Sequence, residues 1–341
     1  MAVSASISYR GSLMNTTTPN TAPPPARGRF HTSAATALAL GILLYALYAI
    51  GRGLEDTALH LRNMQWSLYL AVLGLTLVNY GLRFLKWVYL LGRVEVSVPW
   101  ALNLRIFITG LAMAITPAKA GELVKPYLLM KARDIPMTRT VPVLVSERLT
   151  DGLAVIILAA IGVGTHYSQA TWLVFGVLAL TGGLIIAFMI KPVGLFLLNT
   201  AAKLPGFRKF TPRIASSYMA MRSCLQPLPL ALMLILSLVA WFAECVGMWL
   251  VFKGLLVPAT LDVSTFLYAF STVFGAPAPG GLGMADVALV EGGLQLLADM
   301  NGGQAIAAAM LIRVATLWFG VVMGAFLLLR LNRWLPGANR D

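Results

Sequence analysis

Ionisable side chains within the apolar parts of this sequence are the first candidates for chemistry. A charged group near the centre of a bilayer costs roughly 2.5–3.5 kcal/mol on insertion scales, so each one needs a reason to be there. Arginine can hold a phosphate through two parallel donors, and a carboxylate can hold an amine. The candidate substrate-binding residues are Lys119, Glu122, Lys125, Glu147, Arg148, Asp151, Glu244, Asp286, Glu291 and Arg313.

These charges together suit a lipid headgroup that has phosphate and amine parts. Glu147 and Asp151 are four residues apart and would share one helix face. Taken singly, each charge could equally form an internal ion pair or extend to the membrane interface. We expect two arginines to hold the phosphate and one of four acids to meet the cation; these are Arg148 and Arg313, and Glu122, Glu147, Glu244 and Asp286.

Proline and glycine interrupt two apolar segments that could otherwise continue as membrane helices. The segments are AITPAKAGELVKPYLL, residues 114–129, and FGAPAPGGLGMADVAL, residues 274–289. Each is predicted to lie in a re-entrant pair of half-helices, about 101–131 and 264–299, whose free N–H groups at the turn favour an anion. Alternatively, the turns only pack helices together. The turn residues are Pro117, Gly121, Pro277, Pro279, Gly280, Gly281 and Gly283.

The two interrupted segments follow one pattern. In each, a proline precedes a glycine by four residues and an acid follows; the prolines are Pro117 and Pro279. An arginine in the next span comes 31 residues after the first proline and 34 after the second. Half-repeats of about 66–165 and 228–330 would lie in opposite orientations, as in many transporters that bind substrate where their repeats meet.

The composition sets the fold class. Only 11% of the 341 residues are charged and 58% are hydrophobic, whereas soluble domains have about 25% charged residues. The sequence predicts an all-α polytopic membrane protein with about six transmembrane helices and two re-entrant hairpins in an inverted repeat.

One transmembrane domain, 32–335, lies between a disordered cytoplasmic tail at 1–31 and a short one at 336–341, and includes a basic interfacial loop at 191–227. The predicted spans are 34–51, 66–90, 143–165, 171–190 (which connects the half-repeats), 228–252 and 304–329.

The net charge of +13 is better explained by the positive-inside rule than by nucleic-acid binding. With the N-terminus inside, 22 of the 26 Lys and Arg residues fall on the cytoplasmic side, among them Arg83, Lys86, Lys125 and Arg148. Both termini are therefore predicted to be cytoplasmic, in a multi-pass protein of the inner (cell) membrane. The two cysteines and three histidines show no metal-ligand or catalytic spacing, so no metal, cofactor or enzymatic activity is expected.

Several stretches carry a resemblance to a known family. They resemble the transmembrane flippase domain of bacterial lysylphosphatidylglycerol synthases and its stand-alone relatives, over about residues 34–330. Ala118 stands where glycine is common in that family, and Asp286 where glutamate is common. The stretches are GLRFLKWVYLLG (81–92), TPAKAGELVKPYLL (116–129), SERLTDGLAV (146–155), PGGLGMADVAL (279–289) and LIRVATLWFGVVMG (311–324).

The resemblance implies lipid translocation and not aminoacylation, because the synthase proper uses a separate cytoplasmic aminoacyl-transferase domain. It implies a flippase-like domain that moves a phospholipid or a polyprenyl-linked lipid between leaflets, through a charged groove between two inverted repeats. A lipid-synthesising enzyme would be a natural partner, and the headgroup stays open. Two other functions also stay open: an intramembrane enzyme acting on a phospholipid or polyprenyl-phosphate carrier, and a non-transporting scaffold of a lipid-synthesis complex.

Overall fold

The computed structural model describes residues 54–166, 171–190 and 211–335, and these residues form helices and turns without a strand. The predicted all-α fold class is confirmed. Both predicted tails and the first predicted span lie outside the described residues.

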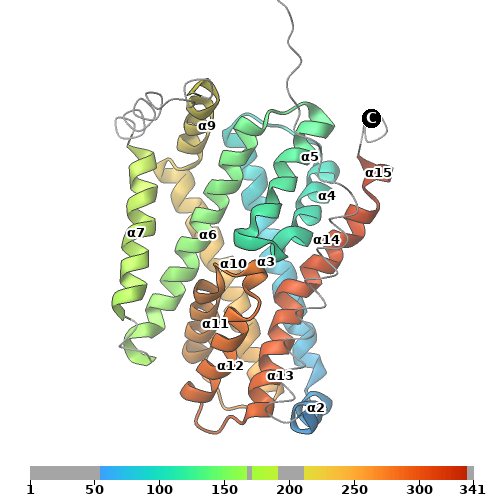
Figure 1. The fold of residues 1–341 in the computed structure, drawn as a ribbon, viewed down its shortest axis with the longest axis vertical. Coiled ribbons are helices and arrows are strands. Elements are labelled where there is room, and N and C mark those ends of the chain that lie inside the picture. Colours follow the sequence, from blue (N-terminus) through green and yellow to red (C-terminus); the bar gives the residue numbers. More distant parts are fainter. Residues whose placement is uncertain (1–53, 167–170, 191–210, 336–341) are drawn as a thin grey trace, which may run out of the picture.

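Long helical segments form the body of the molecule (Figure 1). Three of them, 66–93, 227–254 and 302–329, are apolar enough to cross a membrane, and their 28 residues each reach about 42 Å at about 1.5 Å per residue. They agree with predicted spans to within a few residues. The long segments are α3 Trp66–Arg93, α6 Met137–His166, α7 Thr171–Met189, α10 Pro227–Gly254, and the continuous run of α13 Gly302–Arg313, the π-helical η5 Val314–Trp318 and α14 Phe319–Leu329.

The first interrupted segment turns back before it can cross. Its first arm has 12 residues, about 18 Å long, which is short of a hydrocarbon core of about 30 Å. The Thr116 hydroxyl fastens the turn, because it accepts a hydrogen bond from the Gly121 N–H (2.7 Å) and donates one to the Met113 carbonyl (2.8 Å). The elements are α4 Trp100–Leu111, the 3-10 turns η1 Ala112–Ile115 and η2 Pro117–Leu123, and α5 Val124–Arg133.

The second interrupted segment makes a similar hairpin with a glycine-dependent turn. Gly280, Gly281 and Gly283 have φ values of 59°, 73° and 80°, a region that favours glycine. A Cβ on Gly275 would lie only 2.5 Å from the Cβ of Ala285, so glycine also lets the two arms close. The elements are α11 Leu261–Gly275, η4 Pro279–Gly281 and α12 Met284–Leu296.

The hairpins enter from opposite ends of the molecule, and their tips meet near its middle (Figure 1). The turn η4 packs against both η1 and η2. At the contact, a Cβ on Gly280 would lie 3.1 Å from the Cα of Ile115. The two re-entrant segments predicted from proline and glycine therefore share one central contact.

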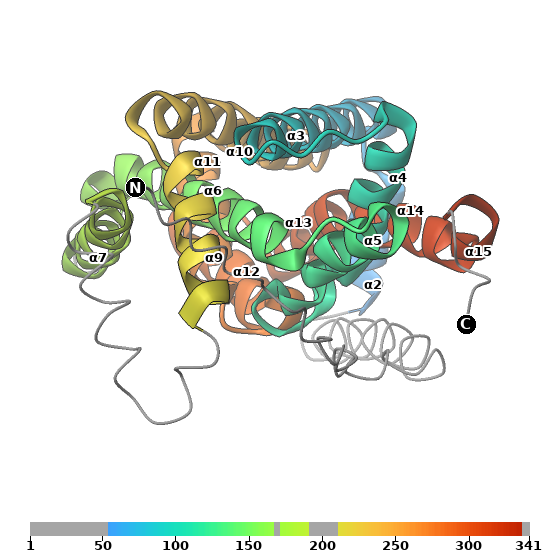
Figure 2. The same cartoon turned by 90° about the horizontal axis from the view of Figure 1, so that it is seen from above.

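The packing of the helices gives the two halves of the chain an inverted relationship. Helices α3 and α10 lie side by side and antiparallel: the Gln65 N–H donates to the Gly254 carbonyl (3.0 Å) at one end, and Arg93 donates to Gln226 (2.9 Å) at the other (Figure 2). The first arm of each hairpin packs on the last span of the other half, α4 on α14 and α11 on α6. This reciprocal packing is that of an inverted repeat.

Each hairpin is embedded in an apolar core of its own. One core joins the second hairpin to α10 and α13, with Phe252 and Ile312 fully buried. The other joins the first hairpin to α3, with Trp87 and Leu129 fully buried. The tips therefore lie between two well-packed regions, which fixes the side chains beside them.

The outer faces of the long helices are apolar. Leu70 of α3 and Leu228 of α10 are each 69% exposed, and Leu180 of α7 is 74% exposed. Such a surface would favour aggregation in water, but it suits contact with lipid tails. The structure is therefore that of a multi-pass membrane protein.

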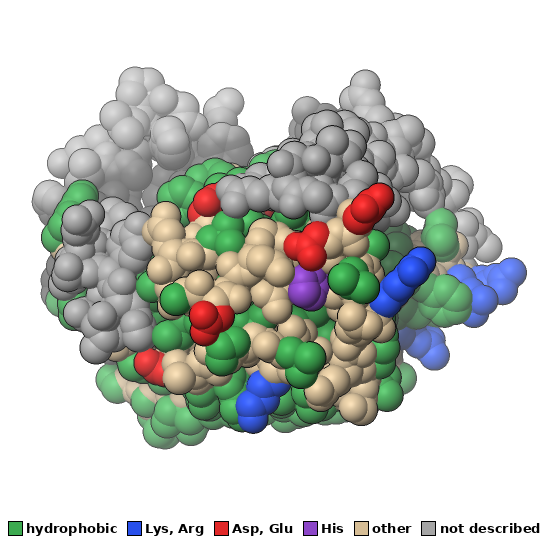
Figure 3. Space-filling model, turned by 90° about the horizontal axis from the view of Figure 1, so that it is seen from below, with side chains coloured by type: hydrophobic (Ala, Val, Ile, Leu, Met, Phe, Trp, Pro, Cys, Tyr) green, Lys and Arg blue, Asp and Glu red, His purple; other side chains and the backbone are tan. Residues whose placement is uncertain are grey.

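Charge differs between the two ends of the molecule. The lower end, where α2 Leu54–Arg62 lies, shows scattered acids and few basic side chains (Figure 3). The upper end carries α9 Thr211–Cys224 and α15 Leu331–Trp334; α9 belongs to the predicted interfacial loop, of which 191–210 lies outside the described residues. The exposed basic residues of the upper end include Arg93, Lys131, Arg133, Arg139, Arg330 and Arg333.

Candidate functional site

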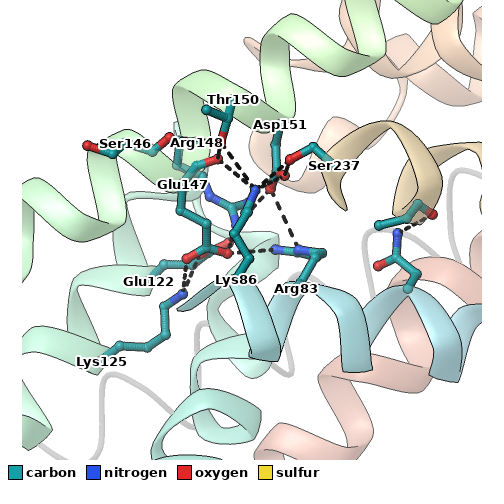
Figure 4. A network of polar contacts seen from close by, with 12 residues as sticks. Arg83, Lys86, Glu122, Lys125, Ser146, Glu147, Arg148, Thr150, Asp151 and Ser237 are labelled. Carbon is teal, nitrogen blue, oxygen red and sulfur yellow. Dashed lines mark hydrogen bonds and ion pairs between the residues drawn. The ribbon is translucent and has the colours of Figure 1, made fainter. Parts of the chain in front are cut away.

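Charged side chains gather beside the tip of the first hairpin, where α3, η2, α5 and α6 meet (Figure 4). We call this group the ionic cluster. Six of its seven residues are buried, and the side chain of Arg148 is 22% exposed. The ionic cluster consists of Arg83, Lys86, Glu122, Lys125, Glu147, Arg148 and Asp151.

Helix α6 supplies the centre of the ionic cluster. Its helical spacing places Glu147 and Asp151 on one face, as predicted, and both contact side chains of α3. Arg148 lies between the acids: it hydrogen-bonds Glu147, and its guanidinium nitrogens lie 3.1 Å from Asp151 Oδ2 and 3.4 Å from Glu122 Oε1. Three acids from two elements therefore share this arginine.

Lys86 of α3 is fully buried and fully engaged. Its ammonium donates to the Asp151 carboxylate, to Ser237 Oγ (2.7 Å) and to Thr150 Oγ1 (3.3 Å). The Ser237 hydroxyl in turn donates to Asp151 (2.9 Å), which brings α10 into the network. Because these acceptors lie on α6 and α10, Lys86 links α3 to two other long helices.

Lys125 brings the hairpin into the ionic cluster. Its Nζ lies 2.9 Å from Glu147 Oε2 and 3.5 Å from Glu122 Oε2. The ring centroid of Trp87 is 4.5 Å from the same ammonium, within the range of a cation–π contact. The stem of Lys125 passes Gly110, where a Cβ would come within 2.7 Å of it, so glycine provides the room.

Arg83 of α3 is held more loosely than the other cations. Its Nε lies 3.7 Å from Asp151 Oδ2 and its terminal nitrogen 3.8 Å from Glu147 Oε1. Both distances exceed a hydrogen bond, and the buried Nε has no hydrogen-bond partner among the described residues. Arg83 is attracted to the acids without being bonded to them.

The sequence did not point to Arg83 and Lys86 as site residues. Counting Arg83, Lys86, Lys125 and Arg148 as cytoplasmic charges was wrong, because all four side chains contribute to the ionic cluster inside the bundle. One signal could have found the first two: cations three residues apart in an otherwise apolar helix share a face.

A second ionic contact links the other hairpin to its own span. Arg313 Nε lies 2.9 Å from Asp286 Oδ1, and its terminal nitrogen donates to the Gly280 carbonyl. The other carboxylate oxygen of Asp286 accepts the Gly283 N–H (2.9 Å) and so caps α12. The π-helical turn η5 begins directly after Arg313.

The two hairpins are held in the same way. Glu122 pairs with Arg148 in the first half, and Asp286 pairs with Arg313 in the second. Each pair joins a hairpin to the span that follows it, which agrees with the repeat seen in the sequence. Among the described residues no ion pair links Arg148 with the Asp286–Arg313 pair, so the two predicted phosphate ligands lie in separate ionic groups.

The remaining candidates lie around these groups. Glu244 is buried in α10, with Thr76 Oγ1 at 3.5 Å and no ion pair within the described ranges. Glu291 is half-buried farther along α12. Lys119 belongs to η2, but its side chain lies outside what the structure describes. The predicted turn residues lie in or next to the turns: Pro117 and Gly121 in η2, Pro279, Gly280 and Gly281 in η4, Pro277 before η4, and Gly283 before α12.

The arrangement suits ionic ligands. Across the parts of the chain that the structure describes, no group of three His, Cys, Asp or Glu side chains could hold a metal ion. Guanidinium groups beside carboxylates can instead bind a headgroup through its phosphate and its amine.

Comparison with known proteins places this site in a family. A family model described as the lysylphosphatidylglycerol synthase TM region matches residues 33–324. The chain belongs to this family. The resemblance expected from the sequence is thereby confirmed, and the ionic cluster, both hairpins and the Asp286–Arg313 pair all lie within the lysylphosphatidylglycerol synthase TM region.

A curated relative is similar over nearly the same length. It is a UPF0104 membrane protein from Methanothermobacter thermautotrophicus (strain Delta H), 23% identical over 317 residues. The match covers 84% of this chain and 90% of the relative. The relative is described as a membrane protein, which agrees with the apolar outer surface of this member of the lysylphosphatidylglycerol synthase TM family.

Proposed function

We propose that this protein is an integral membrane lipid translocase. It moves a phospholipid, or another lipid with a polar headgroup, between leaflets through the region between its two inverted repeats. The observation that carries the proposal is the ionic cluster, which lies deep in an apolar bundle at the tip of a hairpin.

Stability alone does not account for the ionic cluster. Removing charges from water is costly, and well-packed apolar side chains often stabilise a protein as much as a buried ion pair does. Charges inside a membrane bundle mark substrate or ion pathways. The ionic cluster includes a partly exposed arginine, Arg148, through which a polar headgroup could reach it.

The inverted repeat suggests how the headgroup would pass. Broken helices that meet near the middle of the membrane are typical of transporters, whose repeats move against each other around a fixed site. Here each hairpin is tied to its own half by an arginine, Arg148 or Arg313, while the tips touch through η4 and η1. Movement at this central contact would expose the site to one leaflet and then the other, while the acyl chains follow the apolar outer surface.

The proposal includes a setting for this activity. We place the protein in the cell membrane with its basic end in the cytoplasm, following the positive-inside rule. A lipid-synthesising enzyme would supply the substrate. The protein itself would carry out transport and no bond-making chemistry.

Purified full-length protein in liposomes tests the proposal. A phospholipid labelled on its headgroup side is added, and the fraction of label protected from an impermeant quencher is followed with time. We expect the protein to accelerate equilibration, and Arg148→Gln to slow it at least tenfold, because a charge-assisted hydrogen bond is worth about 1.5–3 kcal/mol. The matched control is Arg139→Gln on the exposed start of the same helix.

The outcome distinguishes the alternatives. Label that crosses unchanged supports translocation. A chemically altered lipid would contradict it in favour of an enzyme, and neither crossing nor alteration would favour a scaffold. If wild type and Arg148→Gln moved the labelled lipid at equal rates, the ionic cluster would not be part of the transport pathway.

A further inference from the structure

We propose that Arg83 binds the phosphate of the transported lipid, and that its site takes a phosphodiester with one negative charge. The inference rests on the proposed translocase function and names the substrate class and the residue that recognises it. From the sequence we expected Arg148 and Arg313 to hold the phosphate; the inference adds Arg83 as the residue that recognises it.

The first argument is that Arg83 has unused donors. Its side chain is only 9% exposed, its Nε has no hydrogen-bond partner among the described residues, and its two acidic neighbours lie 3.7 and 3.8 Å away. A buried polar group without a partner is costly, so such groups usually have an explanation. A phosphate oxygen within reach of this guanidinium would supply the missing acceptor.

The second argument is that three other cations, Lys86, Lys125 and Arg313, are occupied. Lys86 donates to Asp151 and Ser237, and Lys125 lies 2.9 Å from Glu147. Arg313 is held by Asp286 and by the carbonyl of the second hairpin turn. A ligand at any of these would have to displace a formed contact, whereas Arg83 needs to displace none.

Arg148 completes the site from the other side. Both guanidiniums lie within ion-pair distance of the same two carboxylate oxygens, Asp151 Oδ2 and Glu147 Oε1. The Nε of Arg148 also has no hydrogen-bond partner in the described part of the chain. Two arginines from α3 and α6 therefore face one pair of acids, and the 22% exposure of Arg148 marks the accessible side.

The charge balance of the ionic cluster sets the charge of the ligand. Among the side chains that the structure describes, it contains four basic and three acidic groups, so in their usual charged forms one positive charge is in excess. One phosphodiester supplies the single negative charge that neutralises it. A phosphomonoester would bring a second charge into a buried site, and an uncharged lipid would leave Arg83 unpaired.

Glu244 is a further buried acid, in helix α10, which packs against α3. It makes no ion pair with Arg83 within 4.0 Å in the described residues. We therefore leave Glu244 out of the balance, and Glu244→Gln is expected to keep the preference for one negative charge.

Equilibrium binding to the full-length protein in detergent tests the inference. The probes are short-chain phosphatidylglycerol, phosphatidic acid and diacylglycerol, titrated calorimetrically. We expect wild type to bind phosphatidylglycerol most tightly, and Arg83→Gln to lose at least about tenfold of that affinity, as for one charge-assisted hydrogen bond. Arg93→Gln, on the exposed end of the same helix, is the matched control and should bind like wild type.

A second variant guards against a folding defect. In Arg83→Gln three cations still balance three acids, so the thermal midpoint should stay close to that of wild type. Arg83→Lys keeps the charge but loses the planar pair of donors, so it should bind phosphatidylglycerol more weakly than wild type and still prefer it to diacylglycerol. Wild-type affinity in either Arg83 variant would overturn the assignment, and tighter binding of phosphatidic acid would overturn the charge balance.

Inorganic phosphate as a competitor separates a lipid site from a free-anion site. Displacement of labelled phosphatidylglycerol by excess unlabelled phosphatidylglycerol but not by phosphate supports the inference; displacement by phosphate alone contradicts it. Binding is measured in detergent, where no lipid can cross a membrane, so it does not depend on transport. The binding test and the transport test can therefore contradict the two proposals independently. Binding through Arg83 without transport would refute the translocase alone, and transport that ignores Arg83→Gln would refute the Arg83 site alone.

Discussion

Glu147 is the residue on which the ionic cluster most depends. It is fully buried, its two oxygens contact Lys125 and Arg148, and Arg83 lies 3.8 Å away. Its carbonyl also accepts a hydrogen bond from Lys86 (3.2 Å). Four cations from three elements therefore converge on one glutamate, whereas Glu244 of the neighbouring span has a hydroxyl as its contact.

We predict that replacing glutamate by glutamine lowers the stability of the protein strongly at position 147 and very little at position 244. Glu147→Gln should lower the free energy of unfolding by about 3–5 kcal/mol, because it leaves the four basic side chains of the ionic cluster with two counter-charges in place of three. Glu244→Gln should change it by less than about 1 kcal/mol, because an amide can still accept from Thr76. Unfolding by denaturant in detergent measures both. Equal losses would show that burial, and not ion pairing, decides the effect.

Among the elements, the hairpin tips determine whether the two halves meet. The second tip depends on glycine twice: Gly280 has a φ of 59°, and its missing Cβ leaves room for the backbone of Ile115. The first tip depends on a side chain instead, since Thr116 caps the turn through its hydroxyl. The same reversal is therefore made by different local chemistry.

We predict that Gly280→Ala will be destabilising by about 1–3 kcal/mol, because alanine is strained at this φ and its Cβ would contact the other hairpin. Gly74→Ala is the matched control: it lies in α3, and a Cβ there meets nothing within 4 Å. Thermal unfolding of both variants in the same detergent checks this. A melting temperature of Gly280→Ala at or above that of Gly74→Ala would show that the tip contact is not tight.

For the whole molecule, the distribution of charge predicts its orientation in the membrane. The exposed basic residues gather at the end that carries α9 and α15, while Asp299 lies at the opposite end, between α12 and α13. Loops rich in Lys and Arg are kept on the cytoplasmic side when a membrane protein is inserted. We therefore expect the end that carries α9 and α15 to face the cytoplasm.

We predict that cysteine labelling in intact cells will show this orientation. In a chain whose buried cysteines, Cys224 and Cys245, are replaced by alanine, Asp299→Cys should react with an impermeant maleimide. Arg133→Cys, at the exposed end of α5, should react only after the cells are permeabilised. The reverse labelling pattern would place the basic end outside and contradict the proposed orientation.

The fold class, the two hairpins and their repeat could be predicted from the sequence. Apolar arms too short to cross, joined by Pro117 or by Pro279 and its glycines, leave the chain no alternative but to turn back, and this is a local property. Which charges meet could be seen only in the packed helices. A cation such as Arg83 or Lys86 can extend to the membrane surface or turn inward, and the choice depends on which face of α3 packs against the acids of α6. Packing between distant segments sets that face, so the spacing of residues along one helix could not reveal it.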